Sequence, residues 1–420
     1  MAAGLAMPSV LSSKAFHASA NETLNVGLIG CRGMGYANLK NFLSLKNCQC
    51  LALSDIDQNV LAEKADDVFN LQNKKPDLYS DYRKLLDRKD IDVVIIGTPD
   101  HWHCLQFVDA CAAGKDVYVE KPIANSIAEC DAMVYAARRY DRVVQVGQQQ
   151  RSGKLWNEMK AYLDTGALGT IGRVHVWANF NYAALAAPIP DSAVPDGVDF
   201  DMWLGPTPQK AFNSQRFHGA WRMFWDYGGG LMTDWGVHLL DMGLWGMNVT
   251  SLPNVAVATG GKFYKPEGVH ETFDTLSVNY QFDNHIMSWE NNAGVQSGPY
   301  GKHYGLFFKG LNGTLVANRE GWQVYPEGEK IPEISATPDD KDGVNHAANF
   351  IECVKTRNKN TACTIENGSL CAKYAQLGNI SARMGGAGLV YDTNKKTFGN
   401  NDADNYLKPA YRSPWKFPEF

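Results

Sequence analysis

Strand-like and helix-like segments alternate strictly along residues 24–150. Short apolar runs such as LNVGLIG and DVYVEKP are each followed by a segment with helical character. The run IDVVIIGTP is continuous and rich in β-branched residues, which is typical of a parallel strand buried on both faces. This alternation predicts a doubly wound α/β fold with a parallel sheet. Ligands of such sheets bind outside the carboxyl ends of the strands, so the residues that follow the strands are the candidates for function.

The pattern changes in the second part of the chain. From about Gly172 onward, spaced segments such as GRVHVWANF and DTLSVNYQF predict an α+β domain with a large, mostly antiparallel sheet that has one solvated face. The sequence LNGT carries the Asn-Gly signal of a hairpin. Helices are expected near residues 346–355 and 366–384, packed back near the first domain. We therefore expect a first domain over residues 24–150, a second over 151–385, and an irregular tail over 386–420.

Charge and composition limit the possible partners. The chain has 40 basic and 45 acidic residues, and the resulting net charge of −5 argues against a nucleic-acid partner held by a basic surface. No apolar run in the sequence is long enough to span a membrane. The nine cysteines include no CxxC pair, and we interpret them as small buried apolar residues rather than as disulfides or metal ligands.

Residues 1–23 form a leader ahead of the first expected strand. The leader contains a short apolar run and the triplet Ala18-Ser19-Ala20. This pattern resembles the later half of an export signal that lacks its charged start, and it predicts a periplasmic protein. The alternative is a cytoplasmic protein with an unstructured leader.

A glycine motif lies between the first expected strand and the first helix. Gly30 and Gly35 fit the first and third glycines of G-x-G-x-x-G, while Arg32 takes the second position with Gly33 beside it. Asp55 ends the second strand about 20 residues further on, which is the context of a dinucleotide site. A carboxylate there accepts hydrogen bonds from both ribose hydroxyls and favours NAD. Arg32 could accept a 2′-phosphate, so NADP remains possible.

The stretch DWGVHLLD places Asp234, His238 and Asp241 at a spacing that brings them to one face of a helix. Three interpretations fit this spacing: a core helix with a satisfied histidine, a metal site, and an acid–base pair facing a substrate. Two carboxylates and one imidazole are a sparse set of metal ligands.

The motif Glu120-Lys121-Pro122, at the end of an expected strand, together with D-x-G-x-H-x-x-D, resembles the Gfo/Idh/MocA oxidoreductases. That family includes glucose–fructose oxidoreductase and inositol dehydrogenase. The resemblance covers about residues 24–385 and implies a Rossmann-type domain followed by an α+β domain that binds substrate and mediates oligomerisation. TPDHWH (98–103) and QQQR (148–151) also resemble family positions that line the nicotinamide pocket.

The resemblance implies roles for individual residues. Lys121 would contact the reacting hydroxyl, His238 would act as the general base, and Asp234 would orient the substrate or His238. The glycine motif and the resemblance together give the expected cofactor-binding set: Gly30, Arg32, Gly33, Met34, Gly35, Asp55, Thr98, Pro99, His101, His103, Glu120, Lys121 and Gln148.

Other residues are candidates for the substrate wall. Arg151 is taken from QQQR, and Trp221, Arg222 and Tyr227 precede the glycines 228–230, although these three could instead pack under the sheet. One of His101 and His103 should face the cofactor, and the other should cap a helix. His346, at the start of a late helix, could also reach the cleft.

The chemistry of alcohol oxidation explains why these residue types are needed. A hydride must leave the carbon and a proton must leave the hydroxyl. A histidine titrates near neutrality and can take that proton, while an ammonium group stabilises the developing alkoxide. With Lys121 as its partner, His238 needs no metal, so we expect no metal site. Asp241, at the far end of the helix face, is then expected to be structural.

The sequence therefore predicts an NAD(P)-dependent oxidoreductase that acts on a CH–OH group of a sugar, polyol or sugar derivative. One alternative is a redox-assisted glycosidase or lyase that keeps NAD tightly bound. A second alternative is a non-enzymatic dinucleotide-binding sensor. Because one face of the antiparallel sheet is expected to lack covering helices, we also expect a homo-oligomer that forms through this sheet.

Overall fold

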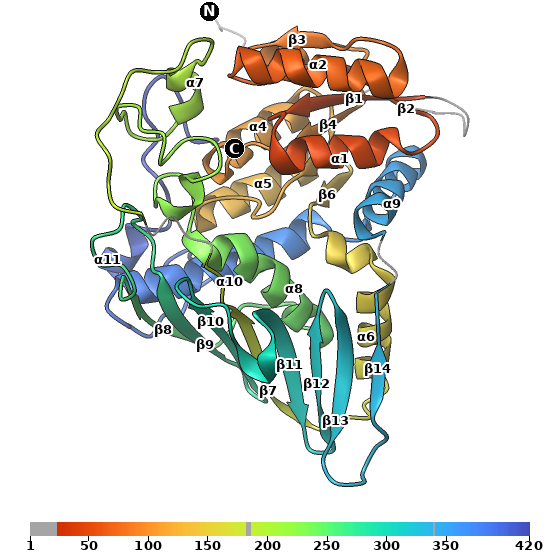
Figure 1. The fold of residues 1–420 in the computed structure, drawn as a ribbon, viewed down its shortest axis with the longest axis vertical. Coiled ribbons are helices and arrows are strands. Elements are labelled where there is room, and N and C mark those ends of the chain that lie inside the picture. Colours follow the sequence, from red (N-terminus) through yellow and green to blue (C-terminus); the bar gives the residue numbers. More distant parts are fainter. Residues whose placement is uncertain (1–22, 182–185, 339–340) are drawn as a thin grey trace, which may run out of the picture.

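The computed structural model describes residues 23–181, 186–338 and 341–420, and it contains two sheets joined by helices (Figure 1). The leader expected over residues 1–23 lies outside the described residues except for its last position, so export stays a prediction. No helix among the described residues is long and apolar enough to cross a membrane.

The first sheet is entirely parallel and has the strand order β3-β2-β1-β4-β5-β6. This order confirms the predicted doubly wound fold and places the change of direction between β1 and β4. The strands are β1 (Leu24–Ile29), β2 (Cys48–Ser54), β3 (Asp77–Tyr79), β4 (Val93–Ile96), β5 (Asp116–Val119) and β6 (Val144–Val146).

Helices cover both faces of this sheet. Val93 and Ile95 of β4 pack into one core with α1 and α2, and Val94 and Ile96 pack into another with α4 and α5. This two-sided burial is why β4 is apolar at every position. The helices that follow the strands are α1 (Gly33–Leu43), α2 (Gln58–Gln72), α3 (Tyr82–Leu86), α4 (Asp100–Ala112) and α5 (Ile127–Arg139).

The second sheet has the order β14-β13-β12-β11-β7-β10-β9-β8, and only β7 and β10 pair in parallel. The LNGT hairpin joins β11 to β12 as expected. The strands are β7 (Ile171–Ala178), β8 (Val255–Gly261), β9 (Thr275–Gln281), β10 (Ile286–Asn292), β11 (Tyr304–Gly310), β12 (Gly313–Asn318), β13 (Gly321–Pro326) and β14 (Ile334–Ala336).

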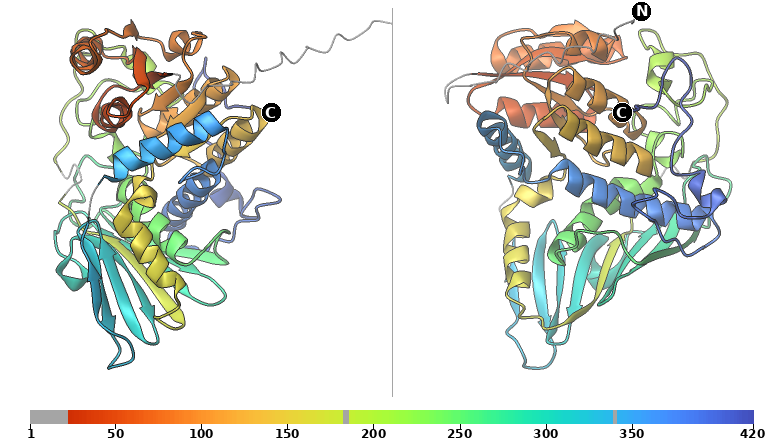
Figure 2. Two further views of the ribbon diagram at one scale, coloured as in Figure 1. Left: turned by 90° about the vertical axis from the view of Figure 1, so that its right-hand side faces the viewer. Right: turned by 180° about the vertical axis from the view of Figure 1, so that it is seen from behind.

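Helices cover only one face of the second sheet, as the left view of Figure 2 shows. Along β9, Leu276, Val278 and Tyr280 are buried under helices, while Ser277 and Asn279 are exposed on the other face. The covering helices are α6 (Lys154–Asp164), α8 (Val237–Gly246) and α10 (Ile365–Arg383).

The late helices connect the two parts of the chain. α9 (Asp342–Thr356) packs against α1, and α10 packs against both α5 and β8. A short helix, α11 (Asn401–Asp404), and an irregular tail follow. The tail returns to the first sheet's helices, where the Tyr411 hydroxyl donates to Glu129 (2.6 Å) and the Trp415 ring lies 4.9 Å from that of Trp102.

Candidate active site

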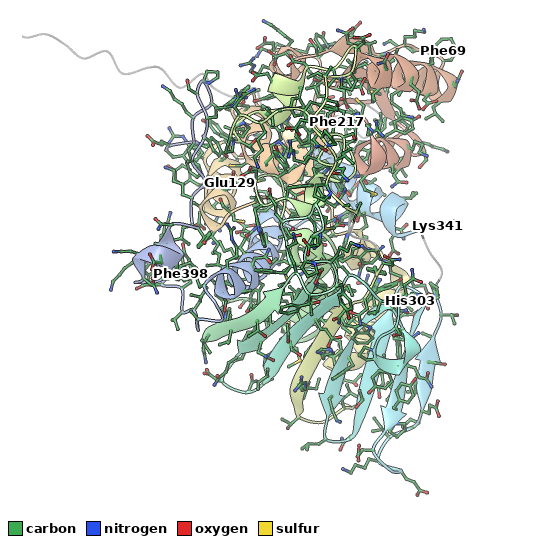
Figure 3. The ribbon with its side chains drawn as sticks, turned by 60° about the vertical axis from the view of Figure 1, so that its left-hand side comes forward. Phe69, Glu129, Phe217, His303, Lys341 and Phe398 are labelled. Carbon is green, nitrogen blue, oxygen red and sulfur yellow. The ribbon has the colours of Figure 1, made fainter. Side chains whose placement is uncertain are left out.

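A cleft runs along the carboxyl edge of the first sheet. Its floor comes from the residues that follow β1, β2, β4 and β5. Its other wall comes from residues between Met202, in α7 (Phe200–Leu204), and Arg222, in a short 3₁₀ turn (Trp221–Met223). We call residues 195–222 the covering segment. Figure 3 labels its residue Phe217, which lies beside the elements of the first sheet. The cleft therefore occupies the place where doubly wound sheets bind dinucleotides.

The glycine turn at the head of α1 is packed too tightly for side chains. A Cβ atom on Gly35 would lie 2.1 Å from the Gly30 carbonyl oxygen, and one on Gly30 would lie 2.7 Å from the Thr98 nitrogen. A Cβ atom on Gly33 would meet nothing within 4 Å, and Gly33 lines the cleft. Because Arg32 at the N-cap makes no side-chain cap, the first turn of α1 fits a pyrophosphate.

Asp55 lies at the opposite side of the glycine turn, at the end of β2. Its two oxygens accept hydrogen bonds from the backbone N–H groups of Cys31 (2.7 Å) and Asp57 (3.1 Å), which fix the carboxylate at the cleft. Burial raises the pKa of Asp55. The acceptor suits the diol of an adenosine ribose. Arg32 and His218 line the same part of the cleft, so the choice between NAD and NADP stays a proposal.

The motif that follows β5 is held by hydrogen bonds on both sides. Glu120 accepts from the Asn38 amide (2.6 Å) and the Gln149 amide (3.2 Å), and burial raises its pKa. The Lys121 ammonium donates to the carboxylate (2.7 Å) and the carbonyl (2.9 Å) of Asp234. The side chains of this pair are only 8% and 9% exposed. The pair therefore joins the edge of the first sheet to the segment that leads into α8.

Asp234 and His238 come from one continuous helical stretch. Asp234 lies in a π-helical turn (Met232–Gly236) that continues into α8, which carries His238. Turns of this type are frequent at functional sites. The Arg222 Nε lies 3.2 Å from the Asp234 carboxylate, which is therefore shared by two cations.

His238 is buried, and its surroundings favour the neutral form of the imidazole. Burial lowers its pKa well below the ordinary value, and the nearby charges of Lys121 and Arg319 lower it further. Its Nδ1 atom has no hydrogen-bond partner among the residues that the structure describes. A neutral ring with an unpartnered nitrogen can accept a proton from a hydroxyl that reaches it.

Some expected site residues lie behind the cleft wall. His101 bonds to the Trp203 carbonyl (2.9 Å), and the two ring nitrogens of His103 lie 2.7 and 2.8 Å from the carbonyl oxygens of Pro122 and Thr98, of which the neutral ring donates to one. Burial lowers the pKa of both histidines to about 4. They hold the cleft wall from behind, whereas we expected one to face the cofactor and the other to cap a helix. Tyr227 also packs in this wall, 4.8 Å from the Trp203 ring.

Other expected residues form structural links. The Arg151 guanidinium, expected at the substrate, instead makes two 2.8 Å hydrogen bonds to Asp241. His346 bonds to Ser152 and to a β6 carbonyl, away from the cleft. Gln148 donates to the Val237 carbonyl (3.1 Å).

The remaining candidates line the cleft itself. They are Gly30, Arg32, Gly33, Met34, Asp55, Thr98, Pro99, Glu120, Lys121, Trp221 and Arg222. Within the described ranges no group of three or more His, Cys, Asp and Glu side chains could hold a metal ion.

From the sequence, no individual role was assigned to several residues that the fold brings to the site. Asp100 and Gln106 of α4, and Trp203 and His218 of the covering segment, line the cleft. Arg319 approaches His238 from the turn between β12 and β13. Only Asp100 carried a signal, because it follows the expected strand in TPDHWH. The others come from segments whose position depends on tertiary packing.

The glycine turn, the strand-end lysine and the buried histidine fit what a dinucleotide-dependent oxidoreductase site requires. The chain belongs to the Gfo/Idh/MocA oxidoreductase family. The family's NAD-binding Rossmann fold model matches residues 24–148, and its C-terminal alpha/beta domain model matches residues 157–417. The protein is thus an oxidoreductase with an NAD-binding Rossmann domain, which confirms the predicted family, fold class and cofactor type.

Curated relatives match over a limited stretch. Glycosyl hydrolase family 109 protein 1 of Shewanella sp. strain MR-4 is 35% identical over 122 residues, which is 28% of this chain and 27% of the relative. The α-N-acetylgalactosaminidase of Shewanella oneidensis is 34% identical over 122 residues, with the same coverage of both chains. The match thus spans about a quarter of each relative.

Solved structures match over most of the chain. Levoglucosan dehydrogenase, in complex with NADH and levoglucosan, superposes with a TM-score of 0.67 at 20% identity over 88% of this chain and 99% of that one. The aldose–aldose oxidoreductase from Caulobacter crescentus, complexed with glycerol, gives a TM-score of 0.65 at 18% identity over 88% and 99%. At this identity the likeness establishes the shared fold.

Proposed function

We propose that the protein is an NAD-dependent oxidoreductase acting on a secondary hydroxyl of a sugar, polyol or sugar derivative. The observation that carries the proposal is that Lys121, which lines the cleft, is paired with Asp234 and lies close enough to His238 to influence its charge. NAD, when bound, supplies the hydride acceptor. Gly30, Gly33 and Asp55 would hold it.

The protein's own residues would manage the proton. His238, kept neutral by burial and neighbouring cations, would accept the hydroxyl proton. Lys121, aimed by Asp234, would stabilise the developing negative charge on that oxygen. Arg222 and Lys121 both pair with the Asp234 carboxylate, which holds the two cations in place. A bound hydroxyl would compete with Asp234 for hydrogen bonds from these two donors.

The names of the structural neighbours support a sugar as substrate. The dehydrogenase neighbour carries levoglucosan, and the Caulobacter neighbour is named an aldose–aldose oxidoreductase. Aromatic surface is available near His238, because the Trp235 ring lies 6.2 Å from the His238 ring and 5.1 Å from that of Tyr304. Such rings suit the apolar faces of sugars.

A second candidate is a redox-assisted glycosidase or lyase that retains its cofactor. The covering segment favours this candidate, because it forms backbone hydrogen bonds across the cleft rim, from Gln58 to the Gly197 carbonyl and from Asp199 to the Ile56 carbonyl, each 2.9 Å. The His218 ring also lies 3.0 Å from the Asp57 carboxylate. These links close the end of the cleft where the adenosine would lie, and they would slow release of the cofactor. The glycosidase names of the curated relatives agree with this candidate.

The two candidates differ in stoichiometry. Mass spectrometry of the purified protein would identify the dinucleotide that accompanies it. A sugar panel with added NAD would then be followed by NADH absorbance and by glycoside cleavage. Net NADH would support the dehydrogenase. Cleavage of an α-N-acetylgalactosaminide without net NADH would support the second candidate, and the absence of both reactions across the panel would contradict the two together.

We also propose that the uncovered face of the second sheet pairs with another copy of the chain. Val257, Ile286 and Tyr325 are exposed apolar residues on this face. Exposed apolar surface of this kind favours association. Light scattering during gel filtration should give a mass above that of the 46.4 kDa monomer, and a monomeric mass would refute the pairing.

A further inference from the structure

Asp100 is a buried acid at the edge of the cleft. It is the first residue of α4, directly after the β4 loop, and only 4% of the residue is exposed. Its side chain nevertheless lines the cleft together with Thr98, Lys121 and Arg222. Among the described residues, no donor is hydrogen-bonded to its carboxyl group. The Asp100 oxygens are not among the fully buried atoms that lack a partner, so they keep some contact with the cleft that the residue lines. A polar group that is largely buried and borders a ligand cleft is expected to find its partner in the ligand.

The surrounding charges are already balanced without Asp100. Lys121 and Arg222 are paired with Asp234, and Glu120 is satisfied by amides. Two cations and two carboxylates therefore cancel, and an ionised Asp100 would leave an uncompensated negative charge in a buried place. Burial accordingly raises the pKa of Asp100 well above its ordinary value. The positive charges of Arg222 and Lys121 lower this pKa, while the negative charges of Asp234 and Glu120 raise it.

The topology indicates which part of the ligand Asp100 meets. In sheets with the order β3-β2-β1-β4-β5-β6, a bound dinucleotide would place its pyrophosphate at the β1 turn and one nucleoside on each side. Asp55 follows β2 and takes the adenosine side. Asp100 follows β4 and Lys121 follows β5, so both lie on the nicotinamide side.

We propose that Asp100 binds the nicotinamide nucleoside of the dinucleotide as a neutral carboxylic acid that both donates and accepts a hydrogen bond. A ribose hydroxyl and the carboxamide each offer a donor and an acceptor, and either group matches this pattern. The proposal rests on dinucleotide binding and not on the sugar chemistry above, so it can fail while the proposed function holds.

The test measures binding of NADH and of ADP, which lacks the nicotinamide nucleoside. NADH affinity is obtained by fluorescence titration, and ADP affinity by displacement of NADH. Asp100→Leu removes both hydrogen-bonding functions and should weaken NADH binding about tenfold or more. ADP binding should change by less than about twofold in the same variant, which also shows that the variant is folded.

Asp100→Asn is the matched control, because its amide keeps one donor and one acceptor in nearly the same shape. It should bind NADH within about threefold of the wild type. Asp55→Asn, on the adenosine side, should weaken both nucleotides. Unchanged NADH affinity in Asp100→Leu would overturn the proposal, and so would an equal loss of ADP affinity. If Asp100→Asn bound NADH as weakly as Asp100→Leu does, the claim that Asp100 binds as a neutral acid would be overturned.

Discussion

Replacing Asp241 with asparagine should destabilise the protein by about 3–5 kcal/mol. The Arg151 guanidinium makes two parallel 2.8 Å bonds to this carboxylate, and the two side chains are 10% and 1% exposed. Removing the negative charge would leave a guanidinium in a place where water cannot compensate it, beside the Trp245 ring at 5.4 Å. Urea unfolding followed by tryptophan fluorescence gives the change in the free energy of unfolding.

A double variant separates structure from chemistry at this pair. Arg151→Met with Asp241→Leu removes both charges and keeps an apolar contact, so its stability should return to within about 1–2 kcal/mol of the wild type. It should also retain activity, because neither residue lines the cleft. Near-wild-type stability in Asp241→Asn combined with lost activity would refute the structural role of the pair. It would indicate instead that Arg151 binds the substrate.

Four further predictions concern the site. Lys121→Met should lower kcat/KM about 10²–10³-fold with a smaller effect on NADH affinity, measured by steady-state kinetics and titration. His238→Ala should lower kcat about 10²–10⁴-fold. Because burial lowers the pKa of His238, the acidic limb of the kcat/KM profile assigned to this base should lie below the pH of an ordinary histidine; a limb at the ordinary value would contradict its buried state. Gly35→Ala should abolish NAD binding while thermal melting still shows a folded protein, since a Cβ atom there would lie 2.1 Å from a backbone oxygen.

Much of the fold could be predicted because its signals are local. Continuous apolar runs such as β4 have to be buried on two faces, and their alternation with helices permits few topologies. The alternating buried and exposed residues of β9 similarly indicated a sheet with one open face. β6 ends at Val146, and a 3₁₀ turn (Gln149–Ser152) follows it before α6.

The site was predictable where a residue follows a strand or lies within a short motif. Lys121, Asp55 and Asp234 are such cases, and the structure places all three at or beside the cleft. Sequence spacing could not show that Arg151 pairs with Asp241, since the two are 90 residues apart and meet only through tertiary packing. Spacing also cannot distinguish a histidine that faces a cleft from one that supports its wall, as His101 does.

The central claim is that Lys121 and His238 carry out hydroxyl oxidation beside a bound NAD. The most direct measurement is a single-turnover experiment in which the NAD-loaded protein is mixed with each sugar of the panel and NADH absorbance is followed in time. The account predicts that at least one sugar produces NADH, transiently or in net amount, in the wild type. Lys121→Met and His238→Ala should bind NAD yet show the signal slowed at least about 10²-fold. A signal of wild-type rate in both variants would contradict the account.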